Sequence, residues 1–241
     1  MIAADRLAEV MAATWPPLHR TRLGPWTIRE GAGGGKRVSA ASAEAAVSAE
    51  DVPQAEAAMR AIGQVPLFLI RPGDAGLDAL LEARKYQKID PVLAYAAALS
   101  QFDPPPEMTC FPHWPPMAIA RCLWAEAGIG PARLAVMARA TGPKSIILAR
   151  TRDRAAGVAF VAMAGAVAML HALEVTANQR RQGSALHILL AAAQWARDQG
   201  GTTLTLAVTE ANAAARSLYV SAGMEVVGQY HYREESCRPI P

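Results

Sequence analysis

A strand-like run that passes through a basic, glycine-containing loop into a helix-like run is the feature that most restricts the fold. Residues 173–190 have the sequence LEVTANQRRQGSALHILL, in which β-type residues come first, two arginines and a glycine follow, and a Leu- and Ala-rich run ends the segment. A strand, loop and helix in this order leave free backbone N–H groups at the helix start, which suits an anion. The segment therefore predicts an anion-binding loop before a helix at 184–199.

Composition limits the classes of function that this loop can serve. The chain has 241 residues with 52% hydrophobic content, enough for one large globular domain or two small ones. The net charge is only +3 and no lysine or arginine run occurs, which argues against a nucleic-acid partner. The cysteines at 110, 122 and 237 are far apart and form no cluster with histidine, so we expect no metal site and no disulfide framework. Reduced thiols predict a cytoplasmic protein.

Two apolar segments could suggest a membrane or a leader. The first, MIAADRLAEVMAATWPP, carries Asp5 and Glu9, which predicts a helix of the mature protein rather than a signal peptide. The second, 155–175, approaches the ~20 apolar residues of a membrane span. Ala164 and Gly165 supply a turn in its middle, so we expect a buried hairpin and no membrane partner.

A proline-rich segment divides the chain. Residues 103–116, DPPPEMTCFPHWPP, hold six prolines, which remove backbone donors and fix φ too often for a helix or a central strand. We therefore predict a linker at 103–116 between an N-terminal domain at 1–102 and a C-terminal domain at 117–241. Both parts mix helices and strands, which indicates an α/β (α+β) fold. Besides the helix at 184–199, the expected helices are 51–62, 74–84, 117–127, 131–140 and 212–221; the expected strands are 66–70, 90–97, 145–150, 158–163, 167–175, 203–208 and 225–233, with a strand, glycine turn and strand in 24–43.

The two parts contain segments that look alike. Residues 67–89 and 204–227 each predict a strand, an acidic or amide turn, a helix and a second strand. Chance is the competing interpretation, because any strand–helix–strand unit has this outline. If the repeat is genuine, the first copy has lost its chemistry, since Leu81 and Lys85 stand roughly where Tyr219 and Gly223 do. The N-terminal part would then be a scaffold or a substrate wall.

The loop itself has the spacing Arg-x-x-Gly-x-Ala from Arg180 to Ala185, with Arg181 as a second cation. Gly183 lets the backbone approach a ligand and Ala185 keeps the first helical turn slim, so a pyrophosphate would fit. The pattern is neither a Walker loop nor a G-x-G-x-x-G turn. Alone it is also compatible with an ordinary solvent-exposed loop.

A second motif about thirty residues later makes the pattern specific. In EANAAARSLYVSAGME, Asn212 opens a helix and a glycine ends it. With the loop, this segment resembles the GNAT superfamily of acyl-CoA-dependent N-acetyltransferases over roughly 117–233. The family signature Q/R-x-x-G-x-G/A is matched from Arg180 to Ala185. Its N-x-x-A-x-x-L-Y-x-x-x-G pattern is matched by Asn212, Ala215, Leu218, Tyr219 and Gly223.

The resemblance implies a GNAT fold, with a mixed central sheet, a splayed pair of strands and flanking helices, and it admits a tandem of two GNAT-like halves in which the N-terminal half is degenerate. It implies acetyl-CoA as cosubstrate and no metal. The strand before the loop would pair with the pantetheine arm, the loop would bind the pyrophosphate, and Asn212 would reach the arm. Two departures occur, since the usual proline after the strand is Ala177 and the last glycine is Ala185. The implied cofactor-binding residues are Leu173, Glu174, Val175, Arg180, Arg181, Gln182, Gly183, Ser184, Ala185, Asn212 and Tyr219.

Acetyl transfer to an amine requires a base, because an alkyl amine with a pKa of ~10 is mostly protonated at neutral pH. His171 is the first candidate, since strict alternation puts it on the face of Val175, and LHALEV followed by RRQGSA is similar to the stretch of arylalkylamine N-acetyltransferases that holds a working histidine. Glu174, expected on the opposite face, and water are the alternatives. His171 could equally be a hydrogen-bonded residue beside the core.

The leaving thiolate requires an acid, and the resemblance implies Tyr219, whose competing role is packing. A backbone N–H of the splayed strand would polarise the thioester carbonyl. We therefore predict an N-acetyltransferase that moves an acetyl group from acetyl-CoA to a primary amine by direct attack. The alternative is an acyl-CoA-binding regulatory or structural protein without turnover. The acceptor could be a small amine, an amino acid, an antibiotic or a protein N-terminus, and the protein a monomer or a homodimer.

Overall fold

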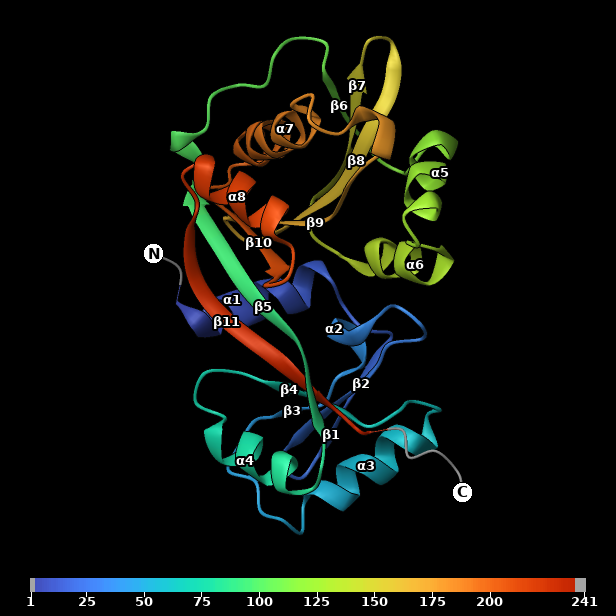
Figure 1. The fold of residues 1–241 in the computed structure, drawn as a ribbon, viewed down its shortest axis with the longest axis vertical. Coiled ribbons are helices and arrows are strands. Elements are labelled where there is room, and N and C mark those ends of the chain that lie inside the picture. The colour runs from blue at the N-terminus through green and yellow to red at the C-terminus, as the bar shows by residue number, and fades with distance from the viewer. Residues whose placement is uncertain (1–2, 237–241) are drawn as a thin grey trace. The chain divides into compact units, whose positions relative to one another are not determined.

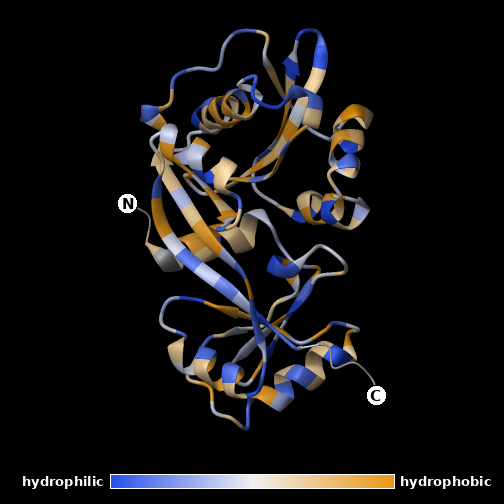
Figure 2. Ribbon diagram, in the orientation of Figure 1, coloured by the Kyte–Doolittle hydropathy of each residue, from blue (hydrophilic) through white to orange (hydrophobic). Residues whose placement is uncertain are grey.

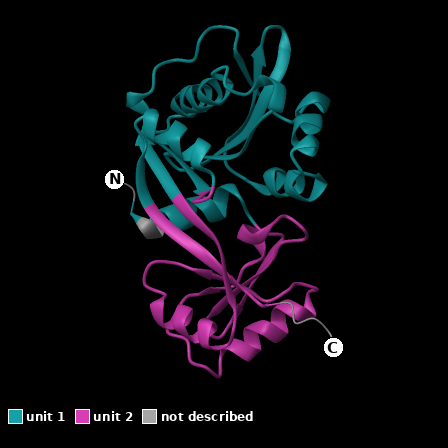
Figure 3. Ribbon diagram, in the orientation of Figure 1, with its two compact units in different colours: residues 1–16, 94–208, 212–227 teal, residues 17–93, 209–211, 228–241 magenta. Residues whose placement is uncertain are grey.

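The computed structural model describes residues 3–236, which form two compact units (Figures 1 and 3). Unit 1 takes in the described residues up to 16, then 94–208 and 212–227, and unit 2 takes in 17–93, 209–211 and the described residues from 228 onward. The units interleave along the chain. Neither therefore coincides with the continuous segments 1–102 and 117–241 that the sequence suggested as domains.

Unit 1 is built on an antiparallel arrangement of four strands, to which a fifth adds in parallel. The strands are β6 (Cys110–His113), β7 (Lys144–Thr151), β8 (Arg154–Ala164), β9 (Val167–Val175) and β10 (Thr203–Thr209). The helices are α1 (Ala4–Thr14), α5 (Ala118–Glu126), α6 (Pro131–Arg139), α7 (Ser184–Asp198) and α8 (Ala213–Ser221), with short 3₁₀ turns at η1 (Leu99–Gln101) and η2 (Ala177–Gln179). The end of β5 (Gln87–Ala98) and the start of β11 (Glu225–Glu234) complete the unit.

Helices cover both faces of this part of the sheet. Helix α7 packs on β6 to β9, and a Cβ added at Gly157 of β8 would lie 3.1 Å from Cδ1 of Ile188. Helix α1 packs on β8 and β9, where Phe160 contacts Trp15. Residues 157 and 160 of one strand point to opposite faces, so α7 and α1 lie on opposite sides. Figure 2 shows the hydrophobic residues of α7 and of these strands.

The apolar stretch 155–175 is the predicted hairpin. Strands β8 and β9 pair in antiparallel register and turn at Gly165, whose φ of 61° is in the left-handed region. Within residues 3–236, no helix is long and apolar enough to cross a membrane.

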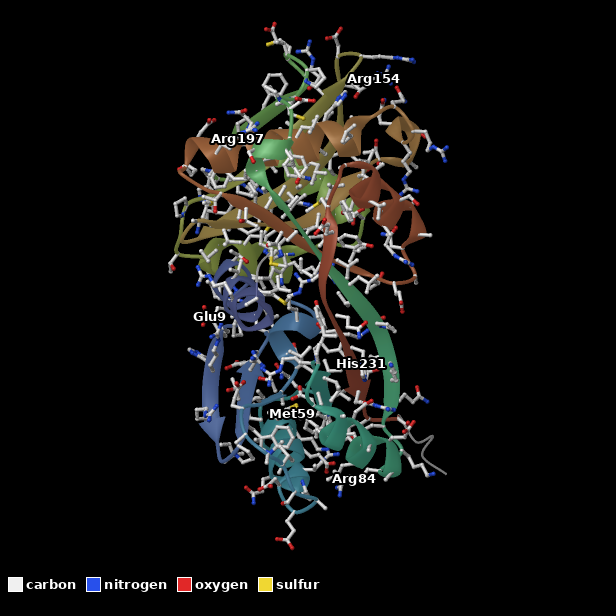
Figure 4. All side chains as sticks on the ribbon, turned by 90° about the vertical axis from the view of Figure 1, so that its left-hand side faces the viewer. Glu9, Met59, Arg84, Arg154, Arg197 and His231 are labelled. Carbon is white, nitrogen blue, oxygen red and sulfur yellow. The ribbon has the colours of Figure 1, made fainter. Side chains whose placement is uncertain are left out.

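The proline-rich segment is more than a linker, which corrects the expectation for 103–116. Residues Cys110–His113 form strand β6, which pairs with β7 at the edge of the sheet. Pro112 fits there because an edge strand can leave one side of its backbone unpaired. The chain that leads into this segment is fixed by Arg197 of α7, whose Nη1 donates to the carbonyl oxygens of Leu99 and Phe102 (Figure 4).

Unit 2 has its own core around a three-stranded antiparallel sheet, in the order β1-β2-β3. A parallel bridge from Ala41 to Phe68 joins the chain beside β3 to β4. Also within unit 2, Asp78 Oδ1 accepts from Nε2 of His231 at 2.9 Å and from Nε of Arg233 at 2.6 Å, which ties β11 to α4. His231 is labelled in Figure 4. The elements are β1 (His19–Leu23), β2 (Trp26–Glu30), α2 (Lys36–Ser39), β3 (Ser42–Ala43), α3 (Val52–Ala61), β4 (Leu67–Ile70) and α4 (Ala75–Ala83).

Most expected elements are present, and one more region besides 103–116 is corrected. Between β2 and β3 the chain forms the short helix α2 instead of a simple glycine turn. Strand β1 was missed, because its sequence, HRTRL, has no apolar alternation and its side chains are mostly exposed.

The two repeats share one connectivity. The first, β1 to β5, has three antiparallel strands, helix α3, strand β4, helix α4 and strand β5; the second, β7 to β11, has the same order with α7 and α8. Within unit 2 the end of β11 lies between β4 and β5, and within unit 1 the end of β5 lies between β10 and β11. The repeats therefore exchange their last strands, and the tandem arrangement is consistent with this sheet order.

The residue pairs that the sequence comparison matched stand at equivalent positions in the two repeats. Leu81 and Tyr219 each stand six residues after the first residue of their helices, 75 and 213. Lys85 and Gly223, which follow these helices, both adopt positive φ, 69° and 78°. The backbone turn is thus kept in the first repeat, whereas the phenol is not.

Candidate active site

Strands β9 and β10 separate halfway along their length. Their parallel pairing runs from Val167↔Thr203 to Leu170↔Leu206, and in the part of the chain that the structure describes no pair between them follows. The backbone of residues 171–175 on the β10 side is therefore open. This is the splayed pair of strands that the resemblance implied.

A β-bulge in β9 lies at the point of separation. Glu174 is opposite Val158 and His171 is opposite Phe160, so three steps on β9 match two on β8. The extra residue is accommodated at Ala172, whose φ is 50°. Residues directly opposite in an antiparallel pair share a face.

The bulge overturns the expected facing of these side chains. His171 and Glu174 share one face, whereas Val175 points to the other face with Gly157, near Ile188 of α7. Alternation by two had predicted His171 with Val175 and Glu174 opposite. It failed because one added residue reverses the facing of everything beyond it.

His171 is held in the core against α1. Its side chain is 5% exposed and its ring stacks on Trp15 with centroids 4.9 Å apart. Nε2 lies 2.9 Å from Oγ1 of Thr14, and the Thr14 hydroxyl donates its only proton to the carbonyl of Val10 at 2.7 Å. Nε2 must therefore be the donor in the contact with Thr14. This geometry is that of the competing interpretation, a hydrogen-bonded histidine beside the core.

Glu174 is half-buried beyond the splay point. Burial raises the pKa of its carboxyl, and the positive charges of Arg180 and Arg133 oppose this only in part. A carboxylate with a raised pKa is a stronger base than an ordinary glutamate. The position thus suits proton acceptance.

Tyr219 of α8 is buried beside Tyr95 of β5, with 6% of its surface exposed and the two ring centroids 5.7 Å apart. Burial first, and then the charges of Glu174 and Tyr95, raise the pKa of Tyr219 to about 12. The phenol therefore holds its proton at neutral pH. The negative charge of Glu174 is therefore near enough to act on the Tyr219 phenol.

The loop before α7 has the geometry of an anion site. Gly183 precedes the helix with φ 82°, and Arg181 has φ 62°. Among the described residues, the backbone N–H groups of 182–186 donate to no acceptor, whereas the His187 N–H donates to the Gly183 carbonyl. Free N–H groups at a helix start, next to a left-handed residue, form a concave site for an anion.

Side chains of the loop form hydrogen bonds to the nearby backbone. Arg180 Nε donates to the carbonyl of Val175 at 3.3 Å, and Gln182 Nε2 donates to that of Asn178 at 3.2 Å. Ser184 is buried, and its hydroxyl lies 3.0 Å from that of Thr151 on β7. Ala177, where the family has proline, begins the 3₁₀ turn η2. Ala185 stands in the first turn of α7.

Asn212 caps α8, because its Oδ1 accepts from the N–H of Ala215 at 3.1 Å. Leu173 and Val175 lie with Glu174 on the stretch of β9 that has no partner on its β10 side. The structure thus brings the expected loop, strand end and Tyr219 together in unit 1, but directs His171 toward α1.

Two residues of this region carried no signal in the sequence. Tyr95 belongs to the first repeat, about 120 residues before Tyr219, and Trp124 of α5 donates its indole N–H to the carbonyl of Ala172 at 2.8 Å. Tyr95 reaches this region because the repeats exchange their last strands, and Trp124 does so through its hydrogen bond to the bulge residue Ala172.

The possible metal ligands and the cysteines of residues 3–236 are as follows. No group of three or more His, Cys, Asp or Glu side chains in this range could hold a metal ion. Cys110 and Cys122 are free thiols, and Cys237 lies outside the described residues.

Comparisons with known proteins identify the family and the fold. Residues 108–224 match the model of the acetyltransferase (GNAT) family. The chain is 22% identical over 243 residues to the uncharacterized N-acetyltransferase YobR of Bacillus subtilis strain 168, covering 95% of this chain and 97% of the relative.

Two solved structures share the fold over nearly the whole chain. A GCN5-related N-acetyltransferase from Kribbella flavida superposes with a TM-score of 0.73 at 18% identity, covering 98% of this chain and 97% of that one. A tandem GNAT protein from the clavulanic acid biosynthesis pathway superposes with a TM-score of 0.61 at 13% identity, covering 98% and 89%.

Proposed function

Because this chain belongs to the GNAT superfamily of acetyltransferases, we propose that it transfers an acetyl group from acetyl-CoA to a primary amine by direct attack. The observation that carries the proposal is the separation of β9 from β10 beside the unpaired N–H groups of 182–186. The open backbone edge of β9 suits an extended amide chain, and the unpaired N–H groups of 182–186 suit an anion. Acetyl-CoA has both, in its pantetheine arm and its pyrophosphate.

The cosubstrate would bind along β9 and at α7. Backbone groups of Leu173, Glu174 and Val175 would pair with the pantetheine amides as an added strand would. The N–H groups of 182–186 would hold the pyrophosphate, and Arg180 and Arg181 would add positive charge. Asn212 would reach the arm through its amide N–H₂ group. A backbone N–H at the bulge would polarise the thioester carbonyl.

The transfer itself forms one bond and breaks one. The neutral amine nitrogen attacks the thioester carbonyl carbon, an N–C bond forms, and the C–S bond breaks. One proton leaves the amine for a base, and one proton goes from Tyr219 to the coenzyme A thiolate. The products are an acetamide and a free thiol.

We assign the base to Glu174, directly or through a water molecule, in preference to His171. Nε2 of His171 donates to Thr14 and its ring stacks on Trp15, so we place the acceptor amine beside Glu174 instead. Glu174 is half-buried, has a raised pKa and acts on Tyr219 electrostatically. Base and acid would then lie on either side of the reacting carbonyl.

The charge of Glu174 would also change the acidity of Tyr219 in the course of the reaction. While ionised, Glu174 raises the pKa of Tyr219 and so weakens it as an acid. Once Glu174 has accepted the amine proton, this charge is gone and the pKa of Tyr219 falls. The phenol thus becomes a better donor as the thiolate leaves.

A panel of amines with acetyl-CoA, followed by thiol release, tests the proposal. The panel should include small amines, amino acids, aminoglycoside antibiotics and peptides with free N-termini. Release with at least one class, dependent on both substrates, is the expected result. Binding of acetyl-CoA without release for every class would favour the alternative, an acyl-CoA-binding regulatory or structural protein.

A further inference from the structure

The bulge residue Ala172 is held from outside its own strand. Its φ of 50° is one that a residue with a Cβ adopts only at an energetic cost. The carbonyl of Ala172 accepts a 2.8 Å hydrogen bond from the indole of Trp124. Trp124 lies on α5, which packs on β8 and β9, and its side chain is fully buried.

The facing of Glu174 depends on this bulge. Without the extra residue at 172, alternation would turn Glu174 to the side of Val175, toward α7. With the bulge, Glu174 shares the face of His171. The charged or titratable groups that act on Glu174 are Arg180 of the loop, Arg133 of α6 and Tyr219 of α8.

We infer that Trp124 is a positioning residue, which fixes the bulge at Ala172 through its indole N–H and thereby aims Glu174 at the reacting amine. The inference rests on the proposed function of Glu174 as the base. Trp124 touches neither cosubstrate nor acceptor in this scheme. It acts through the backbone carbonyl of Ala172, two residues before Glu174.

Trp124→Phe removes the N–H and keeps a large aromatic side chain. We expect kcat to fall ~10–100-fold, the loss typical of a misplaced catalytic group, while the Kd of acetyl-CoA changes little. Trp195→Phe is the matched control, because the described structure records no hydrogen bond from the indole of Trp195 on α7. Its kcat should stay within about twofold of the wild-type value.

A second variant separates positioning from packing. Glycine adopts positive φ without the steric cost of alanine, so Ala172→Gly stabilises the bulge without help from the indole. The double variant Trp124→Phe with Ala172→Gly should regain most of the lost kcat. A residue that only fills the core would not be rescued in this way.

A third measurement needs no turnover. The Glu174 carboxyl can be titrated by NMR in protein labelled with ¹³C-glutamate and assigned by the signal lost in Glu174→Gln. In Trp124→Phe its pKa should differ from that of the wild type, because the side chain leaves the face of His171, where burial raises its pKa, and turns toward α7. Trp195→Phe should titrate like the wild type.

These results keep the two proposals apart. If wild-type protein releases no thiol with any amine, the proposed function fails, and the NMR titration alone decides the role of Trp124. An unchanged Glu174 titration in Trp124→Phe overturns the positioning role. So does a loss of kcat that Trp195→Phe reproduces or that Ala172→Gly does not reduce.

Discussion

The rings of Tyr95 and Tyr219 pack together with their centroids 5.7 Å apart and their planes tilted by 53°. Tyr219 belongs to α8 of the second repeat, whereas Tyr95 belongs to β5, the last strand of the first repeat. Within unit 1 the end of β5 lies between β10 and β11. The first repeat thus supplies a side chain that packs on the proposed acid, although it keeps no phenol at its own equivalent position, Leu81.

Tyr219→Phe should separate catalysis from binding. The ring and its packing on Tyr95 are kept, but the thiolate loses its proton donor, so kcat should fall ~10²–10⁴-fold while the Kd of acetyl-CoA stays level. Single-turnover kinetics and calorimetry measure the two quantities. Tyr95→Phe is the matched control and should change kcat only a few-fold. Equal effects of both changes would leave Tyr219 as a packing residue.

Glu174→Gln should change stability in a pH-dependent way. Because burial raises the folded pKa of Glu174 above its unfolded value, the folded protein binds this proton more tightly, and stability is lost as the pH rises through the folded pKa. The variant should therefore unfold at higher urea than wild type at pH 7, with a smaller difference near about pH 3, where the carboxyl is protonated in both states. Glu126→Gln, an exposed position on α5, is the control for removing one carboxylate charge. A pH-independent effect of Glu174→Gln would contradict the raised pKa.

Removal of Glu174 should also slow the reaction. The acid limb of the wild-type profile of kcat/KM against pH should follow the raised pKa of Glu174, because the base must be ionised to accept a proton. In Glu174→Gln this limb should disappear together with most of the activity. Persistence of the same limb in the variant would assign it to another group.

Gly183→Asp should abolish acetyl-CoA binding. The carboxylate would stand at the anion site, and a Cβ at Gly183 lies 3.3 Å from Nε2 of His187. In the wild type, acetyl-CoA at ~100 times its Kd should stabilise the fold by ~2.7 kcal/mol and raise Tm accordingly. Gly183→Asp should lose this rise.

Gly200→Asp is the matched control for that substitution. Gly200 follows the other end of α7 with φ 81°, and no atom lies within 4 Å of a Cβ added there. Both variants therefore carry a similar backbone cost, ~1–2 kcal/mol. Only Gly183→Asp should lose the rise in Tm, and a loss in both variants would trace the effect to the fold.

Each chain should bind one acetyl-CoA. In the first repeat, the backbone at the end of β3 corresponds to the end of β9 and is already contacted by a side chain of the protein. Arg71 donates to the carbonyl of Ala43 and lies 3.8 Å from Glu44. The loop before α3 already holds a carboxylate, since Asp51 accepts from the N–H and hydroxyl of Ser48. Calorimetry should give a stoichiometry of about one, and Gly183→Asp should leave no residual site. A second equivalent that survives Gly183→Asp would show that the first repeat still binds acetyl-CoA.

The sequence by itself determined the order of nearly all helices and strands, because each depends on neighbours a few residues away. The helix α7 after the loop at 180–183, the cap at Asn212 and the turn at Gly223 follow from local chemistry that the residue types disclose. The same holds for the resemblance that pointed to acetyl-CoA. Motifs of this kind are short, so their spacing is visible in the chain.

Only the tertiary structure decided which side chains meet. The contact of His171 with Thr14 spans 157 residues, the exchange of β5 and β11 joins repeats far apart in the chain, and the bulge at Ala172 reversed the facing of Glu174. Alternation along a strand predicts facing only while pairing is regular, and nothing in the residue types of β9 marks the extra residue. Pairing between distant segments is set by the packing of the whole fold, which no local pattern contains.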